Sequence, residues 1–163
     1  MDHAGELAAV HIYRGQQAVF AAAPAKAAVL AETAEMGAQE QAHLKDFDAL
    51  LTEHAVRPSL LSPLWRTAGF ALGAATALMG ERAAHACTEA VESVIESHYA
   101  GQVRELEASQ PALAAELSQF RDEELAHLDT AVAEGAREAP GYTLLSAMIR
   151  AGCRAAIKIS EKV

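Results

Sequence analysis

Two copies of a Glu-x-x-His motif are the residues of this sequence best suited to bind a metal ion. The first copy is Glu40-Gln-Ala-His43-Leu and the second is Glu124-Leu-Ala-His127-Leu. A spacing of three places the carboxylate and the imidazole on one face of a helix, where both can contact one ion. A lone glutamate precedes each copy, 34 residues before the first and 32 before the second. The pattern predicts a metal centre whose ligands are Glu6, Glu40, His43, Glu92, Glu124 and His127.

The positions of the lone glutamates support this prediction. The midpoint between Glu6 and Glu40 is residue 23, beside Pro24, and the midpoint between Glu92 and Glu124 is residue 108, beside a Ser-Gln-Pro turn. Residues equidistant from the turn of an antiparallel helical hairpin lie at the same height. We therefore expect each hairpin to bring its lone glutamate level with its Glu-x-x-His pair, and two stacked hairpins to bring all six side chains together in a four-helix core.

Four carboxylates in such a core would repel one another and lose their hydration. Two divalent ions would bring the matching charge of +4. Carboxylates and neutral imidazoles with open coordination positions favour iron or manganese over structural zinc. The same ligand set is typical of ferritin-like di-iron and di-manganese proteins. The alternative is that these groups are solvated charges on helix surfaces.

The elements that must position these residues are helices. Apolar residues recur at helical spacing, and no segment shows sustained strand-like alternation. We predict an all-α chain of one domain, residues 1–163, folded as a ferritin-like four-helix bundle with two additional helices. The expected helices span residues 3–22, 25–54, 82–107, 111–136 and 142–160, with one more between Pro63 and Glu81.

The two additional helices, an apolar crossover helix and an amphipathic C-terminal helix, are suited to a membrane surface. Thr67–Gly80 carries no charge over 14 residues, which is too short for a membrane span. The last helix has a basic stripe opposite an apolar side, and that pattern favours anionic lipid. A buried helix and a solvated cationic face are the alternatives. The stripe consists of Arg150, Arg154, Lys158 and Lys162.

Composition excludes other classes of protein. The net charge of −9 argues against a nucleic-acid partner, because neutralising phosphates requires a basic surface. Cys87 and Cys153 are too few for a disulfide framework and predict thiols in a reducing compartment. The first twenty residues lack the pattern of a signal peptide. The remaining unmatched histidines are expected at the surface or in helix caps: His3, His11, His54 and His85.

Longer segments resemble the Coq7 family, also called Clk-1 or Cat5, whose members are demethoxyubiquinone hydroxylases. The resemblance covers nearly the whole chain. It implies a carboxylate-bridged di-iron monooxygenase in which Glu40 and Glu124 bridge the irons, Glu6 and Glu92 are terminal ligands, and His98 and Tyr99 serve the quinone. The segments are DHAGELAAVHIYRGQ, RPSLLSPLW, GFALGAATALMGERAAHACT, VESVIESHY, FRDEELAHLD and AGCRAAI.

The resemblance also implies the reaction and the partners. Two iron ions and O2 would hydroxylate the ring of a polyprenylated demethoxyubiquinol in ubiquinone biosynthesis. The protein would be peripheral to the bacterial inner membrane on its cytoplasmic face, or to the mitochondrial inner membrane on its matrix side. A lipid-binding accessory protein and a biosynthetic complex are expected partners, and a homo-oligomer is left open. The alternative function is iron oxidation or peroxide handling by a relative of ferritin or rubrerythrin. Glu96, one turn after Glu92, would add a fifth carboxylate near the irons.

Overall fold

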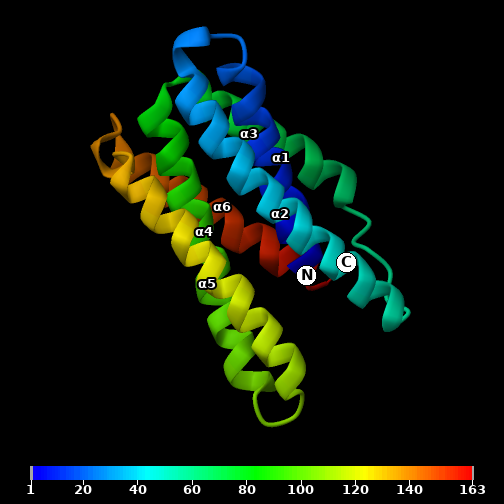
Figure 1. Ribbon diagram of the computed structural model, residues 1–163. Coiled ribbons are helices and arrows are strands. Elements are labelled where there is room, and N and C mark those ends of the chain that lie inside the picture. The colour runs from blue at the N-terminus through cyan, green and yellow to red at the C-terminus, as the bar shows by residue number, and fades with distance from the viewer. Residues whose placement is uncertain (1, 163) are drawn as a thin grey trace. The chain divides into compact units, whose positions relative to one another are not determined.

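The computed structural model describes residues 2–162, which form six α-helices and two short 3-10 helices (Figure 1). No strand occurs within this range, so the all-α prediction is confirmed, and the helices are consistent with a ferritin-like bundle. The helices are α1 Asp2–Phe20, η1 Pro24–Lys26, α2 Ala27–Glu53, α3 Ser62–Leu78, α4 Glu81–Leu106, α5 Pro111–Ala133, η2 Ala136–Glu138 and α6 Tyr142–Ser160.

The helix ends agree with the predictions to within a few residues, and the differences have local causes. Pro24 begins the short helix η1, so α2 starts at Ala27 rather than at residue 25. The predicted helix 111–136 stops earlier, at Ala133. Gly135 has a φ of 87°, a left-handed conformation that suits glycine and ends the α-helical geometry before η2.

The contacts within the chain divide it into two compact units. Unit 1 holds the described residues up to Ala84 and those from Arg154 onward, and unit 2 holds His85–Cys153. Each unit contains one of the two predicted hairpins, α1–α2 in unit 1 and most of α4 with α5 in unit 2. The single-domain organisation stays a prediction.

In unit 1, α1 packs against α3 through bare glycine backbone. A Cβ added to Gly69 would lie 2.5 Å from the carbonyl oxygen of Ala8. A Cβ added to Gly73 would lie 2.7 Å from the carbonyl carbon of Ile12 and closer still to its oxygen. No side chain fits at either position, so Gly69-x-x-x-Gly73 allows the close helix approach that is typical of small-residue helix interfaces.

Polar contacts fix α1 against α2 in the same unit. His3 Nε2 lies 2.9 Å from Asp48 Oδ1 near the start of α1. Further along, Arg14 donates to the side chain of Gln41 at 2.8 Å. Apolar side chains fill the remaining space in two clusters, one of Phe20, Val29, Ala77 and Ala84 and one of Leu7, Val10 and Leu44.

In unit 2, small side chains let α4 lie deep in the protein. All residues from 85 to 92 are buried, whichever side of the helix they occupy. Toward its C-terminal half, Tyr99 packs on Phe120 of α5, with 6.4 Å between the ring centroids. Ala86 of α4 forms a cluster with the η2 region and with Leu145 of α6, which fixes the first half of α6 in this unit.

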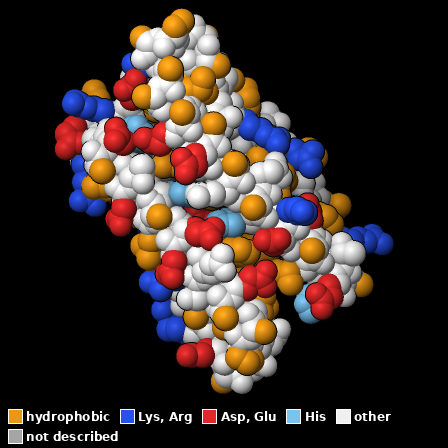
Figure 2. Space-filling view, viewed as in Figure 1, with side chains coloured by type: hydrophobic (Ala, Val, Ile, Leu, Met, Phe, Trp, Pro, Cys, Tyr) orange, Lys and Arg blue, Asp and Glu red, His pale blue; other side chains and the backbone are white. Residues whose placement is uncertain are grey.

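Among the described residues, no helix combines the length and the apolar character that crossing a membrane requires. Several large apolar side chains are nevertheless more than half exposed. They include Leu64 and Leu78 of α3 and Leu144 and Met148 of α6. Acidic side chains are scattered over the face that Figure 2 shows, in keeping with the net negative charge.

Candidate metal centre

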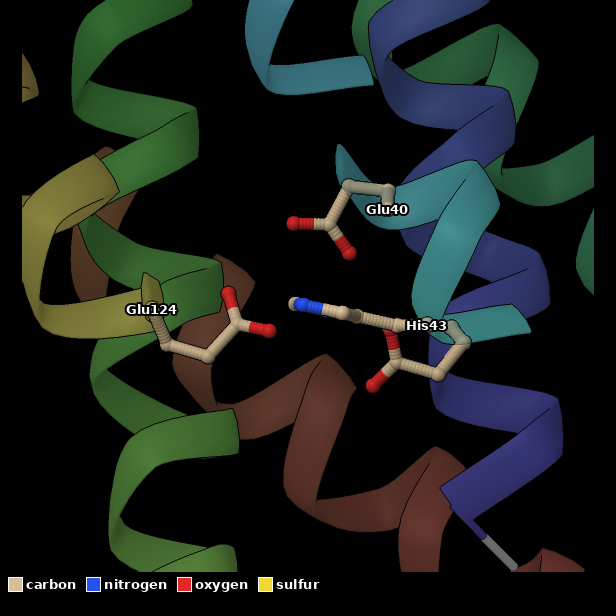
Figure 3. Close-up of side chains that lie close together, drawn as sticks. Glu40, His43 and Glu124 are labelled. Carbon is tan, nitrogen blue, oxygen red and sulfur yellow. The ribbon is translucent and has the colours of Figure 1, made fainter. Parts of the chain in front are cut away.

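In unit 1, α1 and α2 bring Glu6, Glu40 and His43 together. Each of these residues is at most 1% exposed. Each offers one ligand atom, and these atoms lie within 4.8 Å of one another. His43 Nδ1 lies 3.5 Å from Glu6 Oε2, across the two helices. Figure 3 shows Glu40 and His43 leaving the same side of α2, as expected for residues three apart on a helix. We call these three residues triad 1.

Unit 2 contains a second group of the same composition, which we call triad 2: Glu92 of α4 with Glu124 and His127 of α5. Its residues are at most 3% exposed, and one ligand atom from each lies within 4.8 Å of the others. Here His127 Nδ1 lies 3.5 Å from Glu124 Oε2 of its own motif. Figure 3 shows Glu124 projecting from α5.

The donor set of each triad fits a divalent metal ion. Carboxylate oxygens and imidazole nitrogens bind such an ion at about 2.0–2.2 Å, so the ligands of one ion lie up to about 4.4 Å apart. Distances within 4.8 Å need only small side-chain shifts to reach that arrangement. In both triads Nδ1 is the imidazole atom near a carboxylate. Two carboxylates balance the charge of one divalent ion, and three protein ligands leave coordination positions open.

The predicted quinone-handling pair lies farther along α4. The Tyr99 side chain is buried against Phe120, whereas His98 is partly exposed. The two rings are tilted, with 6.5 Å between their centroids. A catalytic role for His98 and Tyr99 stays a prediction.

Two histidines that were expected at the surface are buried, so that expectation is wrong for His3 and His85. His3 lies one turn before Glu6 and contacts Asp48 of α2, which ties the start of α1 to the helix of the first Glu-x-x-His motif. No sequence signal pointed to Asp48 as the partner of His3.

Two further charged residues have partners that the sequence did not indicate. Glu96 accepts a hydrogen bond from Arg121 Nε at 2.6 Å, so its charge is balanced by that guanidinium. Arg150 was assigned to an exposed basic stripe, and this assignment is wrong. Its guanidinium donates to both carboxylate oxygens of Glu89, at 2.8 and 2.7 Å, and to Ser93. Helical periodicity gave the correct spacing but not the side of α6 that packs against α4.

Comparisons with known proteins agree with the resemblance found in the sequence. A relative from Rhodospirillum rubrum, named 3-demethoxyubiquinol 3-hydroxylase, is 49% identical over 163 residues, covering 100% of this chain and 76% of the relative. A Homo sapiens relative is named NADPH-dependent 3-demethoxyubiquinone 3-hydroxylase, mitochondrial. It is 46% identical, and the alignment covers 100% of this chain and 75% of the relative. The Saccharomyces cerevisiae 5-demethoxyubiquinone hydroxylase, mitochondrial, is 42% identical, and the alignment covers 100% of this chain and 76% of the relative.

A family model described as ubiquinone biosynthesis protein COQ7 matches residues 1–160 and therefore includes both triads and the packing helices α3 and α6. With nearly the whole chain matched, and relatives from bacteria to mammals aligned along its full length, this chain belongs to the COQ7 family.

Proposed function

We propose that this chain is a 3-demethoxyubiquinol 3-hydroxylase that works with O2 and two iron ions. One oxygen atom enters a ring C–H bond and becomes the new hydroxyl group. The other leaves as water, and an external reductant supplies two electrons with two protons. The names of the COQ7 relatives support the reaction and the substrate, and the NADPH-dependent name of the Homo sapiens relative suggests NADPH as the source of electrons.

The observation that carries the proposed metal centre is the presence of two buried triads of identical composition. Each places two carboxylates and one imidazole within reach of one ion. We propose that both triads contribute to one di-iron centre, which Glu6, Glu40, His43, Glu92, Glu124 and His127 would hold. Membership of the COQ7 family supports this joining, as does the repeated order of glutamate and Glu-x-x-His along the chain.

When bound, the iron pair supplies the two-electron activation of O2, and the protein supplies geometry and shielding. The triads hold the ions through six side chains, nearly all of which are inaccessible to solvent. Burial keeps competing water away from reactive species. Tyr99 and His98, two turns beyond Glu92 on α4, would border the ring of the quinol and orient it.

We also propose that the protein binds a membrane surface, because its substrate carries a polyprenyl tail that does not dissolve in water. The exposed apolar residues of α3 and α6 would contact lipid, and the exposed Arg154 and Lys158 would contact anionic headgroups. The location would be the inner membrane, on the cytoplasmic side in bacteria or the matrix side in mitochondria. A lipid-binding accessory protein and a biosynthetic complex would deliver and accept the quinones.

The proposed function is tested by single turnover. Iron-loaded protein is reduced without oxygen in the presence of demethoxyubiquinol and is then exposed to 18O2, and the ring is analysed by mass spectrometry. We expect one labelled oxygen atom in the product. Iron analysis should give about two ions per chain, and Glu124→Gln should abolish both iron pairing and product. Glu105→Gln, an exposed glutamate of α4, serves as the control. Unlabelled product, or full turnover by Glu124→Gln, would contradict the proposal.

A further inference from the structure

Arg150 of α6 binds α4 on both sides of the sequence position of Glu92. Its Nη2 donates to the two carboxylate oxygens of Glu89, and its Nε donates to Ser93 Oγ at 3.0 Å. The Glu89 side chain is 5% exposed and the Arg150 side chain is 28% exposed. A planar guanidinium that contacts two acceptor groups fixes direction as well as distance, which a lysine ammonium does not.

The two acceptors define one line along α4. Glu89 and Ser93 are four residues apart and lie one turn above each other, whereas Glu92 lies about 60° around the helix from Glu89. A contact at two heights on one line resists rotation of the helix about its axis. The carboxylate of Glu92 lies roughly 6 Å from that axis, so a rotation of about 10° moves it by about 1 Å. A shift of that size is large for a ligand atom.

We propose that Arg150 is a positioning residue for Glu92: through Glu89 and Ser93 it sets the rotation of α4 and thereby the geometry of triad 2. The inference rests on the proposed metal centre, because it assigns Arg150 a role only if Glu92 binds metal. The first half of α6 would then have two roles. One side positions α4 through Arg150, and the opposite side carries the exposed Leu144 and Met148 that are proposed to contact lipid.

The test measures metal affinity rather than turnover. The chain is titrated with Co²⁺ alone, and binding is followed through the visible absorption of the ion. We expect Arg150→Met and Glu89→Gln to weaken the affinity about tenfold and to alter the absorption bands, as is usual when the support of a metal ligand is removed. Arg150→Lys keeps the charge but loses the planar contact, so it should recover only a small part of the affinity.

Two control variants separate positioning from loss of stability. Arg104→Met removes an exposed arginine of α4 and should leave Co²⁺ affinity unchanged. Leu145→Ala loosens the packing of α6 in the Ala86 cluster without touching Glu89 or Ser93, so it should lower the melting temperature while affinity stays near that of the wild type.

The results distinguish failure of the positioning role of Arg150 from failure of the proposed metal centre. Unchanged affinity in Arg150→Met, full recovery in Arg150→Lys, or an equal loss in Leu145→Ala would overturn the positioning role alone. If the wild type binds no Co²⁺, or if Glu92→Ala binds it as tightly as the wild type, the metal centre itself fails, and the role of Arg150 fails with it.

Discussion

Replacing Gly73 with alanine should destabilise the protein through a single added methyl group. The new Cβ would lie 2.7 Å from the carbonyl carbon of Ile12, whereas carbon atoms in ordinary contact are about 3.7 Å apart. Relief requires α3 to move away from α1 by about 1 Å, because the obstructing atoms belong to the backbone and no side-chain rotation can displace them.

The size of the effect follows from two opposing terms. Overpacking a tight interface costs typically 1–3 kcal/mol, and a clash with backbone belongs at the upper end of that range. Alanine regains up to about 1 kcal/mol of helix propensity over glycine. The net loss is therefore about 2 kcal/mol, which lowers the melting temperature of a chain of this length by roughly 4–8 °C.

Thermal unfolding followed by circular dichroism measures this directly, and Gly152→Ala is the matched control. A Cβ at Gly152, in the exposed part of α6, meets no atom within 4 Å, so this variant should gain about 0.5–1 kcal/mol. Gly69→Ala should also destabilise the protein. If Gly73→Ala melts at or above the wild-type temperature while Gly152→Ala is stabilised as expected, the close packing of α1 on α3 is refuted.

Three other outcomes are expected. His127→Gln should lower iron content to about half of the wild-type value, measured by elemental analysis, because triad 2 loses its only imidazole; unaltered iron would count against that ligand. His3→Ala should cost about 1 kcal/mol in chemical denaturation, the usual worth of one hydrogen bond, and a loss near zero would mean that its contact with Asp48 contributes nothing. The double variant Arg154→Glu with Lys158→Glu should reduce sedimentation with anionic vesicles at least tenfold in low salt. The control Arg57→Glu should not, since Arg57 lies in the loop after α2. Equal binding by the wild type, the double variant and the control would place the lipid contact elsewhere.

The helices could be predicted because their signals are local. Apolar spacing and prolines near the turns act over a few residues, so the predicted ends lie close to those observed. Gly135 is the exception, since its left-handed conformation ended α5 earlier than the apolar pattern suggested. The grouping of Glu6 with Glu40 and His43 could also be predicted, because residues that are equally far from the turn of a helical hairpin lie side by side.

The partners of individual charges could not be predicted in this way. Nothing in the spacing of Arg150 distinguishes a side chain that faces lipid from one that binds Glu89, because both occupy a helical stripe. His3 was unpredictable for the same reason, since its contact depends on a residue 45 positions away. The close approach of α3 to α1 depends on Gly69 and Gly73 of α3 and on Gly15 of α1. The importance of these glycines emerges only when the neighbouring backbone is in place.

The glycine-lined side of α3 has a consequence for how this protein can diverge. Any substitution there meets the main chain of α1, so that side is closed to change in every descendant that keeps the fold. The outward side, with Leu64, Phe70 and Leu78, carries no such restriction. Substitutions can therefore accumulate on the outer side, one residue at a time, while the close packing of α3 on α1 stays unchanged.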